Sequence, residues 1–379
     1  MSKLKSVCLN MIVKNESKVI RRCIHSIRSL IDYWVIVDTG STDGTQEIIK
    51  ETLKDIPGEL YERPWKNFEH NRNEAMRLAY PKARYLLFID ADEVLKAPKN
   101  FSLGTLDKDI FLINVQLSSG TMFTRQFMIG TRIRWFWKGV VHEQVYTDVK
   151  STTHRFLEDA YLYASDDGGR TGQDSSVKFL HDAEVLEEAL KTDPRNSRYV
   201  FYLANSYSHA KKLDLALQNY EKRVIMAGWD QEVFYSLYCI GRIQSEMNMP
   251  PEVFINSYYK AYRYRTTRAE PLFWIAHHYM EIKDYEAAYE VLVKAVEIPL
   301  SKDAMMVEHS IYEHALKWMF ADCLFSLKKY EEAEKIYQEL MAKPKLPKEV
   351  RPVMMQNMKQ IQRYLQKTRK SGELPELGF

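Results

Sequence analysis

Short apolar segments alternate with segments of helical spacing over roughly the first 115 residues of the chain. Strand-like runs at residues 6–13 and 33–38 are followed by amphipathic runs at 18–30 and 45–53. Strict alternation of strand and helix is typical of a parallel sheet with helices on both faces. The sequence therefore predicts an α/β domain. We place it at residues 1–175, with a glycine- and tryptophan-containing lid or small antiparallel extension from residue 117 onward.

The pattern changes near residue 176, where glycine becomes rare and long helical segments follow one another. A motif around Ala204 recurs around Ala276 and Ala321, each time followed by a lysine-containing turn and a second helix, and a degenerate copy lies at residues 238–258. A small side chain in the first helix lets the second pack closely, and such hairpins bury their faces by stacking. This pattern resembles the tetratricopeptide repeat, although a helical domain without true repeats is the alternative. We predict an all-α repeat domain over residues 176–379.

Composition places the protein among ordinary globular chains. Apolar residues make up 45% and charged residues 28%, and the net charge of +3 gives no case for a dedicated nucleic-acid surface. No apolar stretch approaches the roughly 20 residues of a membrane span, and the N-terminus lacks a signal-peptide layout. The four cysteines are scattered without metal-ligand spacing, which favours free thiols. We therefore expect a cytoplasmic protein.

An apolar run at residues 85–89 ends abruptly in Asp90 and Asp92. Unpaired carboxylates are too costly to bury in a core, and the carboxyl end of a strand is where open α/β sheets bind ligands. Two oxygen donors this close suit a divalent cation that also binds phosphate oxygens. The alternative is a strand that ends in a solvated acidic turn.

A second strand, at residues 33–38, ends in Asp38 and a tight turn. Gly40 and Gly44 permit the turn, and residues 41–43 are all suitable helix N-caps. A carboxylate at this position can accept a hydrogen bond from the imide of a nucleobase. The alternative is a capped turn with a solvated aspartate.

These motifs occur in the same order in the family 2 glycosyltransferases, which have the GT-A fold. The resemblance extends over roughly residues 5–150, and it rests on residues 15–17, 37–45, 71–75 and 88–92. It implies a Rossmann-like, mostly parallel sheet flanked by helices. One position departs from the pattern, because many members have a second aspartate where this chain has Thr39.

The resemblance implies a donor site for a nucleotide sugar. Asn15 and Glu16 would line it, and Asp38 would contact the nucleobase, with uracil expected. Arg72 would face the diphosphate, since a guanidinium group matches phosphate oxygens in a bidentate way; a structural salt bridge is the alternative. Asp90 and Asp92 would hold Mn²⁺ or Mg²⁺, with Asp92 the more direct ligand. The metal offsets charge on the departing diphosphate.

A later segment, which ends in Gly139, His142 and Glu143, is similar to the Gly-x-Val-His-Glu segment of a family 2 subgroup. That subgroup includes lipopolysaccharide-core glucosyltransferases and bacteriocin S-glycosyltransferases with C-terminal tetratricopeptide-like helices. By this resemblance His142 is a metal or diphosphate ligand, and Glu143 is the base that inversion requires on the acceptor. Trp137, together with Trp135, would stack on the sugar or the acceptor. A structural hydrogen bond for Glu143 and a hydrophobic lid for Trp137 are the alternatives.

The function that the sequence predicts is a metal-dependent inverting glycosyltransferase with UDP-glucose or a similar UDP-sugar as donor. A repeat array forms concave grooves, which favours a polypeptide acceptor; a glycan, a lipid-linked sugar or a modified nucleic acid is the alternative. A rival function is a catalytically inactive nucleotide-sugar-binding scaffold whose repeats bind proteins. The basic aromatic residues at 258–268 suit either an acidic ligand or packing between repeats, and exposed tyrosine-rich faces are compatible with a homodimer.

Overall fold

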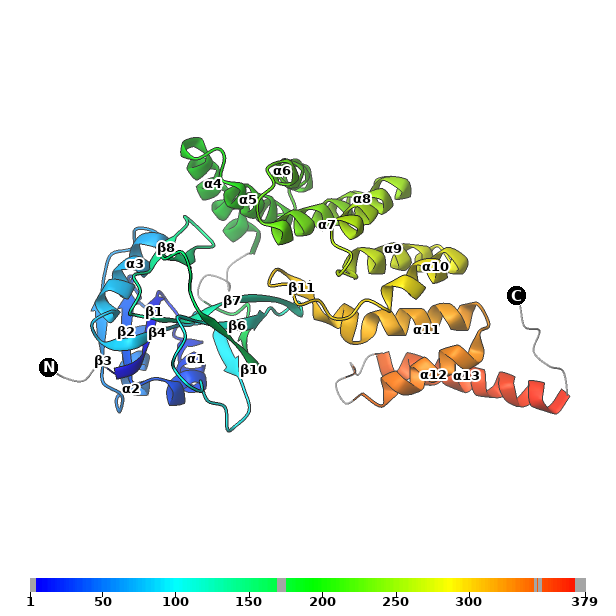
Figure 1. Cartoon of the computed structure of the whole chain (residues 1–379), viewed down its shortest axis with the longest axis horizontal. Helices are drawn as coiled ribbons and strands as arrows, with labels where there is room; N and C mark the ends of the chain where they lie inside the picture. Colours follow the sequence, from blue (N-terminus) through cyan, green and yellow to red (C-terminus); the bar gives the residue numbers. More distant parts are fainter. Residues whose placement is uncertain (1–4, 169–174, 344–345, 347–349, 372–379) are drawn as a thin grey trace. The chain divides into compact units, whose positions relative to one another are not determined.

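The computed structural model describes the chain except for residues 1–4, 169–174, 344–345, 347–349 and 372–379 (Figure 1). Its packing divides the chain into two compact units. Unit 1 consists of Met1–Ser236 and Asp303–Val307, and unit 2 of Leu237–Lys302 and Glu308–Phe379. The change from strands to helices comes at α4 (Ser175–Thr192), which lies at the boundary expected from the sequence. The division of the chain into functional domains at that boundary stays a prediction.

A nine-stranded sheet forms the centre of unit 1, with the order β3-β2-β1-β4-β7-β6-β10-β5 and with β11 paired to β7. β3, β2, β1 and β4 are parallel neighbours, whereas β7 is antiparallel to both β4 and β6. A separate antiparallel pair consists of β8 and β9. The strands are β1 (Lys5–Val13), β2 (Tyr33–Asp38), β3 (Gly58–Glu62), β4 (Ala83–Phe88), β5 (Glu93–Lys96), β6 (Ile110–Gln116), β7 (Thr121–Gly130), β8 (Phe136–Lys138), β9 (Gln144–Tyr146), β10 (His154–Ala164) and β11 (Val307–Glu308).

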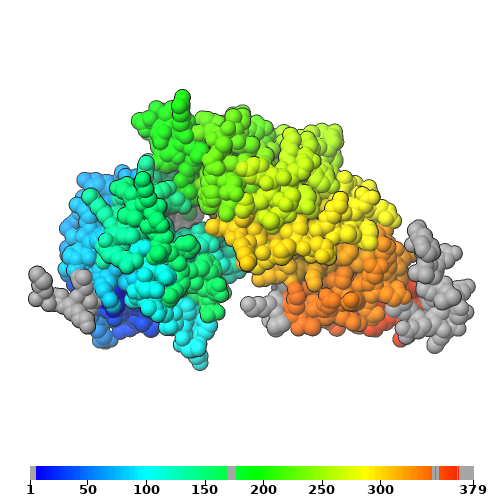
Figure 2. Space-filling model, in the orientation of Figure 1, coloured from blue at the N-terminus to red at the C-terminus, as the bar shows by residue number. Residues whose placement is uncertain are grey.

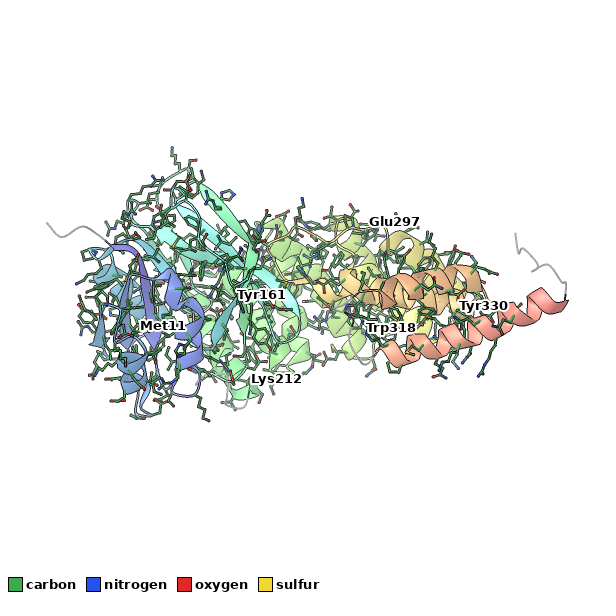
Figure 3. The ribbon with its side chains drawn as sticks, turned by 90° about the horizontal axis from the view of Figure 1, so that it is seen from below. Met11, Tyr161, Lys212, Glu297, Trp318 and Tyr330 are labelled. Carbon is green, nitrogen blue, oxygen red and sulfur yellow. The ribbon has the colours of Figure 1, made fainter. Side chains whose placement is uncertain are left out.

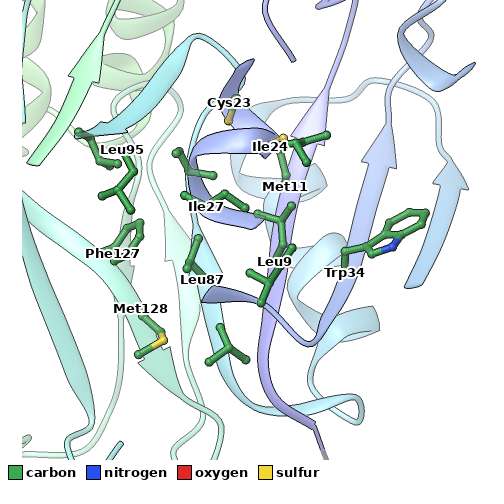
Figure 4. Packing of buried hydrophobic residues seen from close by; sticks show 14 of the residues in the cluster. Leu9, Met11, Cys23, Ile24, Ile27, Trp34, Leu87, Leu95, Phe127 and Met128 are labelled. Atoms are coloured by element: carbon green, nitrogen blue, oxygen red, sulfur yellow. The ribbon is translucent and has the colours of Figure 1, made fainter. Parts of the chain in front are cut away.

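Helices cover both faces of the parallel part of the sheet, as the alternating pattern predicts. On β1, Leu9 and Met11 pack with Ile24 in one buried cluster (Figure 4). Cys8, which faces the other side of the sheet, packs with Met76 in another. Burial on both faces explains why the strand is apolar almost throughout. The covering helices are α1 (Ile20–Ile27) with the short 3₁₀ helix η1 (Arg28–Leu30), α2 (Thr45–Thr52) and α3 (Phe68–Ala79).

The region from residue 117 onward differs in part from the expected lid or small antiparallel extension. The β8–β9 pair is a small antiparallel piece, but β7 and β10 are long strands within the main sheet. β7 is buried at its C-terminal end, where it pairs with β4 and β6. The sheet is therefore parallel on one side and mixed on the other.

The rest of the described chain is almost entirely helical. Helices of unit 2 pack in sequence, for example α11, α12 and α13 (orange to red in Figure 2). No helix among the residues that the structure describes is both long and apolar enough to cross a membrane. After α4 the helices are α5 (Ser197–His209), α6 (Leu213–Ile225), α7 (Asp230–Glu246), α8 (Pro251–Tyr264), α9 (Glu270–Glu281), α10 (Tyr285–Ala295), the π helix η2 (Ile311–Ala315), α11 (Leu316–Ser326), α12 (Tyr330–Met341) and α13 (Val350–Ser371).

Among the residues that the structure describes, four helical hairpins turn in the same way, which confirms the repeat pattern. Each turn has one left-handed residue: Lys211, Asn248, Lys283 or Lys328, with φ of 58°, 54°, 61° and 62°. The next N–H then donates to a carbonyl of the first helix, as from Lys212 (labelled in Figure 3) to Tyr207 at 2.9 Å.

The small residue of the first helix also recurs, always seven positions before the turn. It is Ala204, Ala276 or Ala321, each fully buried, and Gly241 in the degenerate copy. A Cβ at Gly241 would lie 2.7 Å from the ring of Tyr258 on the second helix of that hairpin. The degenerate copy therefore uses glycine because a large ring packs against it.

Candidate functional site

The carboxyl ends of β1, β2 and β4 meet at one edge of the sheet, because these neighbouring strands run in the same direction. Asp38 is the last residue of β2, and Asp90 lies two residues beyond the end of β4. The loop after β1 begins at Lys14 and contains Asn15. Three of the residues singled out in the sequence are thus at the edge where open α/β sheets bind ligands.

The loops that follow β1 and β2 are joined by hydrogen bonds. The backbone N–H groups of the first loop donate to side chains of the second: Asn15 to Ser41 Oγ at 2.9 Å, Glu16 to Thr45 Oγ1 at 2.8 Å and Ser17 to Asp43 Oδ2 at 2.9 Å. The side chain of Asn15 accepts from the N–H of Thr42 at 2.9 Å. Asn15 therefore shapes the loop. Donor contact by Asn15 and Glu16 stays a prediction.

The two carboxylate oxygens of Asp38 have different surroundings. Oδ1 accepts hydrogen bonds from the N–H groups of Gly40 and Ser41, both at 2.8 Å. Oδ2 is buried and has no hydrogen-bond partner among the described residues. A buried acceptor without a partner is costly, so an N–H donor on a ligand would be favoured there. Thr39 instead donates its hydroxyl to the carbonyl of Val13 at 3.1 Å, and it supplies no second acidic contact.

A chain of alternating carboxylates and guanidinium groups runs through the site, in the order Glu143, Arg72, Asp90, Arg125 and Glu93. Arg72 donates from Nε to Glu143 and from Nη2 to Asp90 Oδ1 at 2.7 Å. Arg125, on β7, donates to Asp90 Oδ2 at 3.1 Å and to Glu93. The side chain of Glu93 is 5% exposed and that of Glu143 is 9% exposed. We call these five residues the ion chain.

Burial and mutual charge shift the pKa values of the acidic residues in opposite directions. Burial works against ionised Asp90, but Arg72 and Arg125 hold its pKa below the ordinary value. Burial, followed by the charge of Asp90, raises the pKa of Asp92 to about 6. Burial also raises the pKa of Glu93 to about 7, although Arg125 opposes this shift. Keeping Asp92 and Glu93 ionised in this site therefore costs free energy.

The charge balance of the site fits a divalent cation. The ion chain and Asp92 together carry four carboxylates and two guanidinium groups. Such an excess repels an anionic diphosphate unless a cation offsets it. Both oxygens of Asp90 already accept from arginines, and metal binding by Asp90 and Asp92 stays a prediction.

The three predicted metal ligands do not gather in one place. Within the described ranges, no group of three or more His, Cys, Asp and Glu side chains is arranged to hold a metal ion. His142 is exposed and has a left-handed backbone, with φ of 52°. Its ring stacks on that of Tyr202 on α5, with centroids 4.0 Å apart and planes 13° apart. Glu143 instead pairs with Arg72, so these two neighbours engage different elements. The metal and base assignments stay predictions.

Trp137 lies beneath the guanidinium group of Arg72, which is 4.9 Å from the centre of its ring. The backbone of Trp137 is fixed on both sides by Asn73 of α3, which accepts from its N–H and donates to its carbonyl at 2.8 Å each. Its indole Nε1 is buried without a partner in the described part of the chain. Trp137 thus supports Arg72 in this structure, and stacking on a sugar stays a prediction.

Sequence reasoning missed two members of the ion chain, Glu93 and Arg125. Glu93 directly follows Asp92, and its position one residue beyond two carboxylates was the only local signal. Arg125 had none, because its contact with Asp90 requires β7 to pair antiparallel with β4. That pairing joins strands that are distant in the sequence, and no local motif predicts it.

Comparisons with known proteins agree with the two halves of the chain. Residues 8–99 match the model of glycosyl transferase family 2, and residues 269–301 match a tetratricopeptide repeat model. The first match contains Asp38, Arg72, Asp90 and Asp92. The chain therefore carries a family 2 glycosyltransferase domain and a tetratricopeptide repeat, as the resemblance of the sequence implied.

Two curated relatives that match this chain are glycosyltransferases by name. The SPbeta prophage-derived glycosyltransferase SunS of Bacillus subtilis is 24% identical over 233 residues, which is 58% of this chain and 53% of SunS. An uncharacterized glycosyltransferase of Rickettsia prowazekii is 32% identical over 92 residues, which is 24% of this chain and 30% of that protein. The chain thus spans about half the length of SunS.

Among solved structures, the tetratricopeptide repeat protein YrrB, whose description mentions an unusual peptide-binding site, is 16% identical. The match covers 48% of this chain and 85% of YrrB, with a TM-score of 0.37. A score this low supports no inference about fold or binding.

Proposed function

We propose that this protein is a metal-dependent, inverting glycosyltransferase that moves a sugar from a nucleotide donor to an acceptor engaged partly by the helical repeats. The observation that carries the proposal is the ion chain, whose members Arg72, Asp90 and Glu93 lie at the sheet edge within the family 2 match. The donor is a UDP-sugar, UDP-glucose or a relative, since uracil has an imide N–H that suits the unpartnered Oδ2 of Asp38.

The residues of the site divide the chemistry between the two substrates. Glu143 takes the proton of the acceptor as its nucleophilic atom bonds to the anomeric carbon, on the face opposite the diphosphate. The bond from that carbon to the diphosphate oxygen breaks, and its electron pair leaves with the diphosphate. Mn²⁺ or Mg²⁺, held by Asp92, would offset this charge. Arg72 orients Glu143 and Asp90 together, because it donates to both.

The acceptor is a polypeptide in this proposal. Tetratricopeptide-like hairpins stack into extended concave surfaces that suit a peptide chain, and residues 269–301 match such a repeat. A screen with radiolabelled donor against peptide, glycan and nucleic-acid fractions distinguishes the acceptor classes. Label in the glycan or nucleic-acid fraction alone would overturn the polypeptide assignment.

Donor hydrolysis by the full chain tests the enzyme assignment without a known acceptor. With UDP-glucose and Mn²⁺ we expect release of UDP, and we expect Asp92→Ala to lose about a hundredfold in rate, or ~3 kcal/mol of transition-state stabilisation. The matched control is Asp148→Ala, because Asp148 is exposed on the loop after β9. Chelation of the metal should reduce the wild-type rate by a similar factor.

Calorimetry with UDP separates the outcomes. UDP binding without turnover of several UDP-sugars or transfer to any acceptor fraction would support the inactive scaffold instead. Turnover that Asp92→Ala leaves undiminished would remove the metal assignment. Absence of both binding and turnover would refute the proposed donor.

A further inference from the structure

The loop between β8 and β9 carries Glu143, and α3 holds it from one side. Glu69 of α3 accepts from the N–H of Gly139 at 2.9 Å. One turn further along α3, Arg72 pairs with Glu143. These contacts join the loop to α3, and His142, which lies between Gly139 and Glu143, takes part in neither of them.

The first helix of the first repeat hairpin, α5, holds the same loop from the other side. Arg198 donates from Nη2 to the carbonyl of His142 at 3.1 Å and to the hydroxyl of Tyr202 at 3.2 Å. Its guanidinium group also lies over the Tyr202 ring, 4.7 Å from the centre. The other face of the contact is the stack of His142 on Tyr202. All of these residues belong to unit 1.

Arg198 is itself held in place from inside the helical array. Its Nη1 donates to Glu232 of α7 at 3.2 Å, and Glu232 also accepts from Arg223 of α6 at 3.0 Å. The side chains of Arg223 and Glu232 are 0% and 4% exposed. Buried charges that are paired in this way have few alternative positions. The pair with Glu232 therefore fixes the position from which Nη2 of Arg198 donates to the carbonyl of His142.

The loop needs such support because its backbone is unfavourable. His142 has φ of 52°, and Gly139 has φ of 130°. A non-glycine residue in the left-handed region costs on the order of 1 kcal/mol or more and persists only where surrounding contacts enforce it. Arg198 binds the carbonyl of His142, which is part of the peptide group that leads directly into Glu143. A contact that fixes this carbonyl therefore also fixes the backbone of Glu143, from which its side chain extends.

We propose that Arg198 is a positioning residue for Glu143, so that the first repeat hairpin is part of the catalytic apparatus rather than only a surface for the acceptor. The inference rests on the proposed function, in which Glu143 is the base. Arg198 acts through the peptide of His142 and touches neither substrate. The contact of Arg198 with the carbonyl of His142 thereby couples the first repeat hairpin to the β8–β9 loop.

The experiment compares Arg198→Gln, Arg198→Lys and the control Arg195→Gln in the full chain. Arg195 is exposed in the turn before α5, so its variant makes the same change of charge. For Arg198→Gln we expect the kcat of UDP-glucose hydrolysis to fall about tenfold or more, since a small misplacement of a catalytic group is costly. The Kd for UDP should change less than about twofold, because Arg198 lies outside the donor site. Lysine should restore part of kcat.

Hydrogen exchange gives a readout that does not depend on turnover. In Arg198→Gln, amides of residues 140–145 should exchange faster than in the wild type, while those of β1 and β4 stay protected. Tyr202→Leu is a second variant, which removes the stack on His142 but leaves the pair of Arg198 and Glu232 intact. It should loosen the same amides and lower kcat.

The outcomes separate this inference from the proposed function. A wild type without turnover refutes the proposed function, and faster exchange at 140–145 then still reports on the contact itself. An active wild type whose kcat and loop exchange are unaffected by Arg198→Gln overturns the inference. If Arg198→Gln and Tyr202→Leu each lowered kcat, UDP affinity and melting temperature together, the inference would also be overturned, because such losses indicate a structural role only.

Discussion

The two carboxylate oxygens of Asp38 have different roles: one stabilises the fold, and the other is the one that we propose contacts a ligand. Its Oδ1 closes the turn by accepting from Gly40 and Ser41, while Oδ2 is buried without a partner among the described residues. Asparagine can keep the first oxygen and replace the second by an NH₂ group. The fold should then lose little, because no bond of the described chain depends on Oδ2. A ligand N–H, however, would meet a donor in place of an acceptor.

We therefore expect Asp38→Asn to weaken UDP binding about tenfold or more, in line with the cost of an unpaired buried polar group. The free energy of unfolding should change by less than about 1 kcal/mol. Calorimetric titration with UDP and urea unfolding measure the two quantities. Asp38→Ala is the contrasting variant, since it also removes the bonds to the turn and should lower both. Equal UDP affinity in Asp38→Asn and the wild type would exclude nucleobase contact.

The site residues that could be predicted from the sequence are those that lie within or next to a local sequence motif. Asp38 and Asp90 follow apolar strands directly, so the carboxyl edge was predictable for both. Arg125 lies within β7 and contacts Asp90 only through antiparallel pairing. The opposite engagements of His142 and Glu143 depend on a left-handed residue and on a tyrosine about 60 positions further along. Neither the left-handed backbone of His142 nor its contact with the distant tyrosine follows from sequence periodicity.

At the scale of elements, the β8–β9 hairpin of the site depends on a glycine with a positive φ. Gly139 has φ of 130°, and a Cβ there would lie 3.1 Å from the Cα of Glu143. Contacts this close force the neighbouring backbone to shift. The shift would act directly on the residue that we propose as the base.

Gly139→Ala should therefore lower kcat for donor hydrolysis about tenfold or more, and it should cost roughly 1–3 kcal/mol of stability from backbone strain. Gly120→Ala is the matched control, because Gly120 has φ of 83° at the β6–β7 turn and nothing within 4 Å of an added Cβ. It carries similar strain without the contact. Kinetics and thermal unfolding of both variants provide the comparison, and equal losses of kcat would assign the effect to strain alone.

Elements formed by local signals were predicted closely, and those formed by distant pairing were not. The first strands and helices, and the hairpin repeats with their small residues, follow from periodicity. α3 begins at Phe68, because Asn67 caps it by accepting from the N–H of His70 at 2.7 Å. β10 has a register shift between Phe156 and Tyr161. This irregularity hides the alternation that identifies a strand.

At the scale of the whole chain, the segment Asp303–Val307 leaves the helices of unit 2 in sequence but packs in unit 1. Its Ala304 carbonyl accepts from the N–H of Thr124 at 2.8 Å, and Thr124 is the neighbour of Arg125 on β7. The side chain of Gln231 also contacts the segment, because it accepts from the N–H groups of Ala304 and Met305, at 2.9 and 3.0 Å. The chain therefore passes between the units three times, and this segment is attached beside the ion chain.

Gln231→Leu should release the segment, because two backbone donors lose their acceptor at once and each unpaired group costs about 1–3 kcal/mol. We expect faster hydrogen exchange at Thr124, Ala304 and Met305, and cleavage near residue 304 by a protease that leaves the wild type intact. Gln231→Glu keeps an acceptor oxygen at this position and should retain protection, while Gln218→Leu on the exposed face of α6 controls for the added leucine. Because Thr124 adjoins Arg125, release should also lower kcat for donor hydrolysis more than it changes UDP affinity. If exchange and cleavage in Gln231→Leu matched those of the wild type, the segment would be held by its strand pairing with β7 and not by Gln231.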